Sequence, residues 1–382
     1  MTNKMTFKKL FGKLHLWLGL ATGLVVLIQG LTGAIYCFAP ELQNRQWYRK
    51  VQVEHAPLLP PSQIKQIAEQ RLPGKMVQRI YYDARDKAVM VLFSEKGSYN
   101  YSVFINPYNG DVLKVRDNHR DFFSVVLQLH RTLLIPYGQD IIRWATVVFL
   151  LMLVSGIILW WPRNRKTAKR GFKIMWNAHP KRLNYDLHRI LGFYATWIVL
   201  FTAITGLLFG FENLADRIYQ FTGSRHSVVQ KKPPVSDTSG SITKRNNGLD
   251  LVWGTIQPDL HKKYATALLV LPAGRNGAIL LRANPESGTL YKTDFRYFDQ
   301  FTGKEIPGAY VWGNYRDAHT PADYLKRMNY DIHTGAVWGL PGRIALFFAS
   351  LIVASLPVTG FLFWWGRKHK RRKTTLAGGR HL

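Results

Sequence analysis

The sequence predicts an integral membrane protein of the α+β class. Four transmembrane helices are expected from a duplicated two-helix unit, with two α+β domains outside the membrane. Three observations support this prediction. Four long apolar segments are nearly free of charge, the basic residues gather in three short segments, and the order of motifs in the first half recurs in the second.

The four apolar segments are residues 14–38, 141–161, 190–211 and 343–365. Each is long enough to cross a hydrocarbon core of about 30 Å, which needs roughly 20 helical residues. The first segment could be a secretory signal, but it exceeds the usual apolar region and no small-residue cleavage site follows it. We therefore expect four spans in contact with the lipid bilayer, the first of them an uncleaved helix.

The net charge of +29 is unevenly distributed. Residues 1–13 carry four lysines and no acid, residues 162–187 carry eight basic residues against one acid, and the segment after Trp365 carries seven basic residues and no acid. Because basic residues collect in short cytoplasmic segments, both termini and the middle loop are expected inside and the two long polar stretches outside. The charge thus indicates topology and contact with anionic lipid, and no nucleic-acid partner is expected.

The first polar stretch predicts one helix packed on an antiparallel sheet. An amphipathic helix, Gln63–Arg71, follows the proline-rich PLLPP, with Ser62 as its cap. Alternating segments then predict four strands: Val77–Ala84, Ala88–Ser94, Tyr99–Ile105 and Asp111–Val115. The Asn-Gly pair before the last of them is typical of a hairpin turn.

The second polar stretch repeats this plan. A polar linker, Val235–Gly248, precedes a helix near Leu249–His261. Strand-like segments follow at Ala265–Leu271, Ala278–Ala283 and Thr289–Asp294, and a turn, Asp299–Gly303, leads into Lys304–Ile306. This turn mirrors Asn106–Gly110 of the first stretch.

Equivalent motifs predict that the whole chain is a duplicated unit of membrane helix, outer domain, histidine and membrane helix. The expected organisation is a basic N-terminus (1–13), the first span (14–38), the first outer domain (39–120), an interfacial helix with the second span (121–161), a basic loop (162–187), the third span (188–211), the second outer domain (212–329), a histidine-bearing segment with the fourth span (330–365), and a basic tail (366–382).

Four histidines occupy equivalent positions of the two halves. His15 and His188 stand at the cytoplasmic boundary, and His130 and His333 stand at the outer boundary. If the halves pack about a twofold axis normal to the membrane, His15 meets His188 and His130 meets His333. Two imidazoles on opposite sides of one plane suit a six-coordinate haem iron, so two haems are predicted. With Cys37 as the single cysteine, any haem is held without thioether bonds.

Other interpretations of these histidines stay open. Each alone is typical of an interfacial side chain, and together they also suit a proton relay or a metal site, although zinc or copper would need clustered ligands. Arg131 and Arg189 follow two of the histidines and suit either haem propionates or the headgroup layer. His119 and His319 are expected at the surface, with a role at the outer haem or with a substrate metal as the alternative.

The glycines of the spans have two interpretations. Glycine makes room either for a porphyrin face or for a neighbouring helix. The positions concerned are Gly19, Gly33, Gly192 and Gly206, together with the pairs Thr32-Gly33, Ser155-Gly156, Thr205-Gly206 and Thr359-Gly360.

The sequence shows no motif for a nucleotide cofactor that could supply electrons. No glycine-rich nucleotide motif follows a strand and no P-loop is present, so electrons would come from a quinol or from a cytosolic reductase. The basic segment with Phe172–Trp176 is interpreted as a topology signal, with docking of an acidic partner as the alternative.

Around these residues the chain resembles the PepSY-associated transmembrane helix family. The matching motifs are LHLWLGLATGL, LHR…SGIILWWPR, DLHRILGF and IHTGAVWGLPGR…VTGFLFWW, and the hairpins VFINPYNGDVL and RYFDQFTGKEI resemble PepSY strands. The resemblance implies a multi-pass protein of the bacterial inner membrane with cytoplasmic termini and two periplasmic PepSY-like domains.

The best-understood relatives in that family are ferric-siderophore reductases. The resemblance therefore implies that His15, His188, His130 and His333 are axial ligands of two haem b groups, and that a ferric siderophore or another iron(III) chelate is reduced in the periplasm. It assigns no separate catalytic residue. The alternatives are a non-redox membrane protein that binds a partner through its PepSY-like domains, and a quinone-linked donor to another periplasmic acceptor.

Overall fold

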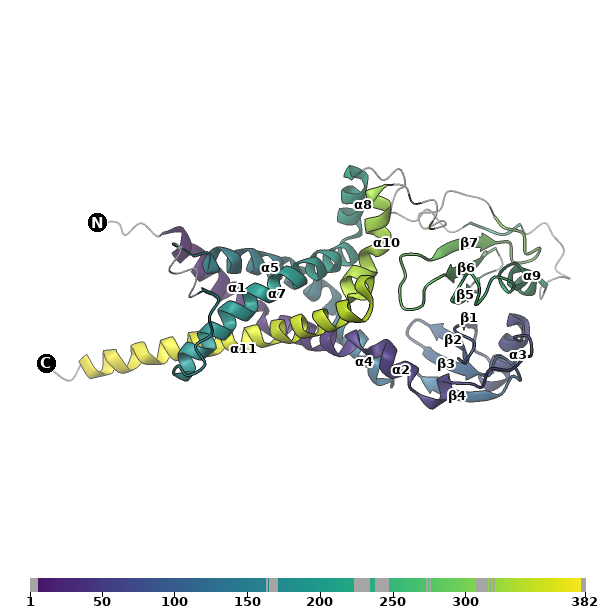
Figure 1. The fold of residues 1–382 in the computed structure, drawn as a ribbon, viewed down its shortest axis with the longest axis horizontal. Helices are drawn as coiled ribbons and strands as arrows, with labels where there is room; N and C mark the ends of the chain where they lie inside the picture. Colours follow the sequence, from purple (N-terminus) through teal and green to yellow (C-terminus); the bar gives the residue numbers. More distant parts are fainter. Residues whose placement is uncertain are drawn as a thin grey trace. The chain divides into compact units, whose positions relative to one another are not determined.

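The computed structural model describes residues 6–162, 164, 171–222, 234–237, 247–272, 274, 276–306, 315, 318 and 320–378 (Figure 1). The chain divides into two compact units. We call Met1–Phe38, Val126–Phe211 and Ile332–Leu382 the helix unit. Ala39–Val125 with Glu212–Asp331 we call the sheet unit.

The four predicted spans are confirmed as long apolar helices. They are α1 (Phe7–Cys37), α5 (Gly138–Trp160), α7 (Pro180–Gly210) and α11 (Gly339–Gly378). Helices α1 and α7 begin before the apolar segments, so His15 and His188 lie about two turns inside them rather than at their ends. The polar turns that precede the histidines continue the helix because no proline or glycine pair interrupts them.

The bundle is a ring in which α1 and α7 each pack against both α5 and α11. Its interior contains mainly small or branched side chains: Val26, Leu153, Ala195, Val199, Ala203, Ala349 and Val353. Gly30 of α1 lies directly against the backbone of Ala354 in α11. Large apolar side chains such as Trp17, Phe201 and Phe348 point outward and are exposed, as expected for helices solvated by lipid. The chain is therefore a multi-pass membrane protein.

The sheet unit contains one seven-stranded sheet of order β4-β3-β2-β1-β5-β6-β7, with every neighbouring pair antiparallel. The strands are β1 (Val77–Tyr82), β2 (Val89–Glu95), β3 (Tyr99–Ile105), β4 (Val112–Asp117), β5 (Thr266–Val270), β6 (Ile279–Asn284) and β7 (Asp294–Phe298). The two long polar stretches thus form one sheet through the pairing of β1 with β5. Each of these strands would be an exposed edge alone, and pairing satisfies its backbone groups.

Two helices cover one face of this sheet. Helices α3 (Pro61–Arg71) and α9 (Asn247–Ile256) bury Ile64 and Trp253 against the strands, and Trp253 stacks on Tyr82 with ring centroids 4.2 Å apart. Ser62 is not the cap of α3, because the helix begins at Pro61 and the Ser62 hydroxyl donates to Asp250 of α9 instead. This bond ties the two helices together.

The predicted strands of the first stretch are present, with β4 ending two residues later than expected. In the second stretch the predicted position of the third strand is wrong, because β7 spans Asp294–Phe298 and not Thr289–Asp294. The backbone N–H groups of Leu290 and Tyr291 donate to the Asp331 carboxylate and so cannot join the ladder. Helix α9 ends at Ile256, earlier than predicted, because Pro258 follows. Most of the predicted linker, residues 238–246, lies outside the described residues.

The two predicted turns have the same hydrogen bonds. Gly110 N–H donates to the carbonyl of Asn106 at 3.0 Å, and Gly303 N–H donates to that of Asp299 at 2.9 Å. In both turns the side chain of the first residue accepts a bond from the backbone two residues on. Both glycines have positive φ, which explains why glycine ends each turn.

The described residues also include four short α-helices and two 3₁₀ turns: α2 (Ala39–Asn44), α4 (Phe122–Thr132), α8 (Glu212–Phe221), α10 (Pro321–Thr334), Trp47–Arg49 and Ala336–Trp338. Of these, α4 and α10 matter most for function. They carry His130 and His333 in their last turns.

Candidate functional site

The four predicted histidines form two pairs in the helix unit. His15 of α1 and His188 of α7 have ring centroids 6.4 Å apart, with ring planes at 88°. His130 of α4 and His333 of α10 have centroids 6.4 Å apart, with planes at 66°. The pairs are the ones expected from the repeat, one histidine from each half of the chain. We refer to them as the inner pair and the outer pair.

The spacing within each pair fits one metal ion between two imidazoles. Two metal–nitrogen bonds of about 2 Å, with roughly 1 Å from each nitrogen to its ring centre, place the ring centres about 6 Å apart. Both observed separations of 6.4 Å agree with this value. Among the residues that the structure describes, no three His, Cys, Asp or Glu side chains gather as a closed metal site would require.

Each histidine is held by a hydroxyl group from a neighbouring helix. The Nδ1 atom lies 2.8 Å from Ser155 Oγ in His15, 2.8 Å from Thr359 Oγ1 in His188, 2.8 Å from Thr32 Oγ1 in His130, and 3.1 Å from Thr205 Oγ1 in His333. These hydroxyls belong to the Ser/Thr-Gly pairs whose role the sequence left open.

The direction of these bonds follows from a second contact of each hydroxyl. Thr32 Oγ1 donates to the carbonyl of Ile28 at 2.6 Å, and the other three hydroxyls donate in the same way to carbonyls of their own helices. Since its one hydrogen is used, each hydroxyl oxygen accepts from the imidazole Nδ1–H. His333 Nδ1 also lies 3.0 Å from the Thr202 carbonyl, which only accepts. Nδ1 therefore carries the proton and Nε2 keeps a free lone pair, as a metal ligand requires.

A glycine beside each hydroxyl makes room for the ring. A β-carbon on Gly206 would lie 3.3 Å from Cε1 of His333, and one on Gly360 would lie 3.4 Å from Cε1 of His188. The corresponding distances at Gly33 and Gly156 are both 3.6 Å. Gly33 and Gly206 thus adjoin histidines directly. By contrast, Gly19 and Gly192 face Met152 and Leu356, so they serve helix packing at those contacts.

A cavity of about 1750 Å³ surrounds the inner pair. It exceeds the roughly 300–1000 Å³ of most ligand pockets, and aromatic side chains such as Trp160 and Trp364 form much of its wall. Basic residues line it as well: Lys9, Lys13, Arg189, Arg367 and Lys368. The cavity therefore suits a large, flat, mainly apolar molecule with anionic groups.

The arginines that follow two histidines differ in their surroundings. Arg189 lines the inner cavity and lies 3.5 Å from the buried carboxylate of Asp186, which Arg182 also contacts at 3.1 Å. Arg131 is exposed. Only Arg189 is thus placed beside a cavity that holds its histidine.

Burial keeps the outer pair neutral. It lowers the pKa of His130 to about 4, with His333 as a second cause, and burial also lowers the pKa of His333. Gln29 of α1 donates to the His130 carbonyl at 2.9 Å and so fixes the end of α4. Both imidazoles are therefore uncharged at neutral pH, the form that binds metal.

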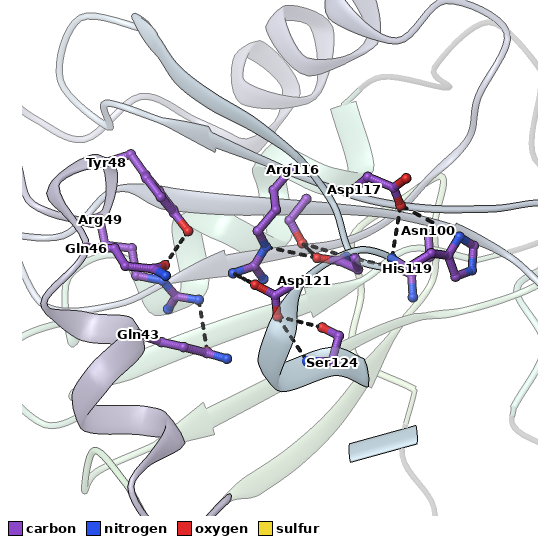
Figure 2. Close-up of polar contacts among 12 residues, drawn as sticks. Gln43, Gln46, Tyr48, Arg49, Asn100, Arg116, Asp117, His119, Asp121 and Ser124 are labelled. Carbon is purple, nitrogen blue, oxygen red and sulfur yellow. Dashed lines mark hydrogen bonds and ion pairs between the residues drawn. The ribbon is translucent and has the colours of Figure 1, made fainter. Parts of the chain in front are cut away.

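The remaining predicted residues take no part in these pairs. The side chain of His119 is half exposed and its Nδ1 lies 3.7 Å from Asp117 (Figure 2), as expected for a surface histidine. His319 lies outside the described residues. Cys37 is a buried thiol outside any disulfide. Phe172, of the segment for which docking was the alternative, makes an edge contact with Trp160, with centroids 4.9 Å apart.

Comparison with known proteins agrees with the sequence. The family model described as the PepSY-associated TM region matches residues 13–367, almost the whole chain. No curated protein matches.

Proposed function

The chain belongs to the PepSY-associated TM family, and from this membership and the two histidine pairs we propose that it transfers electrons across the membrane to iron(III) chelates. The proposal assigns one haem b to each pair, with His15 and His188 as ligands of one iron and His130 and His333 as ligands of the other. The protein would thus be a haem-dependent ferric reductase, with a ferric siderophore as one substrate.

The observation that carries the proposal is the geometry within each pair. The centroid separation of 6.4 Å leaves room for one iron atom in both pairs. A haem held by two imidazoles would supply one-electron transfer at each pair. The chain's own contribution is to hold two neutral imidazoles on opposite helices, with Nδ1 bound to a hydroxyl and Nε2 free.

The inner cavity supports the same assignment. Its aromatic wall suits a porphyrin face, and Arg189, Arg367 and Lys368 suit propionates. A structural zinc site would instead bring four ligands together. The paired arrangement therefore favours haem over zinc.

Orientation and partners complete the proposal. The basic segments favour cytoplasmic termini, and the family membership favours a bacterial inner-membrane protein with a periplasmic sheet unit. Electrons would enter from a quinol or a cytosolic reductase. The matching turns at Asn106–Gly110 and Asp299–Gly303, together with the two equivalent histidine sets, support a duplicated origin.

The experiment is a spectrum of the full-length protein purified from cells supplied with haem. We expect a Soret band, a pyridine haemochrome count near two per chain, and rapid reoxidation of the dithionite-reduced protein by an iron(III) chelate. The matched gallium(III) chelate, which accepts no electron, is the control and should leave the protein reduced. A colourless protein would contradict the proposal and favour a non-redox binding protein. Haem that is reoxidised by other acceptors alone would favour a donor to a different periplasmic enzyme.

A further inference from the structure

The sheet unit has a second face, opposite the helices α3 and α9, where arginines gather and where Tyr48 covers Phe104 at one end. Strand registers align two rows of side chains across all seven strands on this face. One row is Lys114, Phe104, Met90, Tyr81, Leu268, Arg282 and Phe295. The next is Arg116, Ser102, Leu92, Arg79, Val270, Leu280 and Tyr297.

A fourth arginine reaches this face from outside the sheet. The backbone carbonyl of Arg49 accepts a bond from Ala88 N–H at 3.0 Å, next to the start of β2. Its guanidinium lies 5.1 Å from the Phe104 ring centroid, and that of Arg116 lies 5.3 Å from the same centroid. Figure 2 shows Arg49 and Arg116 approaching each other from opposite sides, with Asp121 beside Arg116. We call Arg49, Arg79, Arg116 and Arg282 the arginine face.

Most of this positive charge is not neutralised by the protein. Arg116 Nη1 lies 3.4 Å from Asp121, but Arg49, Arg79 and Arg282 form no ion pair with any residue that the structure describes. The acids that act electrostatically on Arg49 are Asp83 and Asp121. The Nε atoms of Arg49 and Arg282 are buried without a hydrogen-bond partner in the described part of the chain. A buried donor left without a partner destabilises the fold, and an anion that accepts from it would offset that cost.

Like charges also face one another. Burial is the main cause that lowers the pKa of Arg49, and the nearby Arg116 is the second. In the same way, burial and then the charge of Arg79 lower the pKa of Arg282. Both guanidiniums remain charged at neutral pH. Both guanidiniums act electrostatically on the Tyr81 hydroxyl. The floor consists of half-buried apolar side chains: Met90, Leu92, Leu268, Val270 and Leu280.

From this geometry we infer that the arginine face binds the substrate chelate, and that this chelate is anionic. Guanidinium groups offer paired donors that match carboxylate and catecholate oxygens, and they stack on aromatic rings. Tyr81 and the apolar floor suit the organic part of the chelate. The inference deepens the proposed function and rests on it, because it names the charge class of the iron(III) chelate that would be reduced.

The test is direct binding to the oxidised full-length protein in detergent, measured by calorimetry. Gallium(III) tris-catecholate is the anionic probe, since it has the charge and shape of the iron chelate and accepts no electron. We expect it to bind, and we expect the affinity to fall as salt is raised. A cationic gallium(III) hydroxamate chelate should bind far more weakly.

Variants then locate the site. Arg49→Gln and Arg282→Gln should each raise the dissociation constant about tenfold or more, because each removes a charged donor. Arg49→Lys should have an intermediate effect, since it keeps the charge but loses the planar fork. Arg71→Gln is the matched control, because Arg71 is an exposed arginine at the end of α3, in the helix layer on the opposite side of the sheet.

Thermal unfolding shows whether each variant is folded. Each glutamine variant should stay folded with a small loss of stability, because Arg49 donates one hydrogen bond to Gln43 at 3.3 Å and Arg282 contacts the Phe295 ring, while neither forms an ion pair among the described residues. Unchanged affinity in both folded variants, or equal binding of the cationic chelate, would overturn the inference. Because the readout needs no haem, failure here leaves the haem count untouched, and a colourless protein that binds the anionic chelate would contradict only the electron-transfer function.

Discussion

The inner and outer pairs use the same helices in opposite ways. In the inner pair the histidines stand on the long helices α1 and α7, and the hydroxyls come from α5 and α11. In the outer pair the hydroxyls stand on α1 and α7, and the histidines come from the short helices α4 and α10. Helices α1 and α7 thus each serve both pairs, with His15 and Thr32 on α1 and His188 and Thr205 on α7.

This difference predicts that the inner histidines are held more firmly than the outer histidines. The inner histidines are fixed by helices of 31 residues packed along the bundle. The outer histidines depend on helices of 11 and 14 residues, whose own packing is smaller. We therefore expect the outer pair to respond more strongly to perturbation, although both pairs have the same 6.4 Å separation.

The largest expected effect is removal of one histidine from each pair. His130→Ala should reduce the haem count from two to one per chain and abolish reduction of the iron chelate, because one axial ligand is lost. His188→Ala should also leave one haem but spare oxidation of the remaining one by chelate. His119→Ala, an exposed histidine, is the control and should keep both haems. Two haems in His130→Ala would contradict the assignment.

Loss of an orienting hydroxyl should have the next largest effect. Thr32→Val removes the acceptor 2.8 Å from His130 Nδ1 and should weaken haem binding at the outer pair about tenfold, since orienting partners of metal ligands contribute on that scale. Thr32→Ser keeps the hydroxyl and should restore the affinity. Haem retention during dilution measures the haem affinity of both variants. An equal loss in the serine variant would show that Thr32 acts through packing alone.

Two of the glycines that adjoin the histidines, Gly206 and Gly156, should also differ in how they tolerate alanine. At Gly206 the new β-carbon would lie 3.3 Å from His333, closer than ordinary contact, so Gly206→Ala should shift the ring and change the electron paramagnetic resonance signal of the outer haem. At Gly156 the distance to His15 is 3.6 Å, an ordinary contact. Gly156→Ala should therefore leave the inner signal unchanged. The opposite order would reject the predicted difference.

The smallest expected effect is a pH dependence of the outer pair alone. Burial lowers the pKa of Lys326 in α10 to about 8, against the opposing influence of Asp323 and Asp216. Between that value and the ordinary lysine value the unfolded chain binds more protons, so stability of the folded form rises with pH in this window. Release of the outer haem on heating should occur at a higher temperature at pH about 9.5 than at about 7.5.

The inner haem should show no such change, because α10 carries no inner ligand. Lys326→Met should abolish the pH dependence of the outer haem. A dependence that persists in this variant would assign it to another group.

Much of the fold was predictable because membrane spans and hairpins are encoded by local patterns. The four apolar segments were long enough to specify helices without tertiary information. Asn106–Gly110 predicted its turn because glycine takes a positive φ there. The strand at Asp294–Phe298 was misplaced because Asp331, distant in sequence, binds the backbone at Leu290 and Tyr291.

The sequence alone was sufficient for the membrane class, the number of spans and the pairing of the histidines, because length, charge and repetition along the chain encode these properties. The role of the Ser/Thr-Gly pairs was decided by tertiary structure. Thr32 and Ser155 meet His130 and His15 only through the register of neighbouring helices, which no local pattern specifies. The single sheet and its arginine face likewise depend on β1 pairing with β5, strands far apart in the chain, whose backbone groups find each other only when the protein folds.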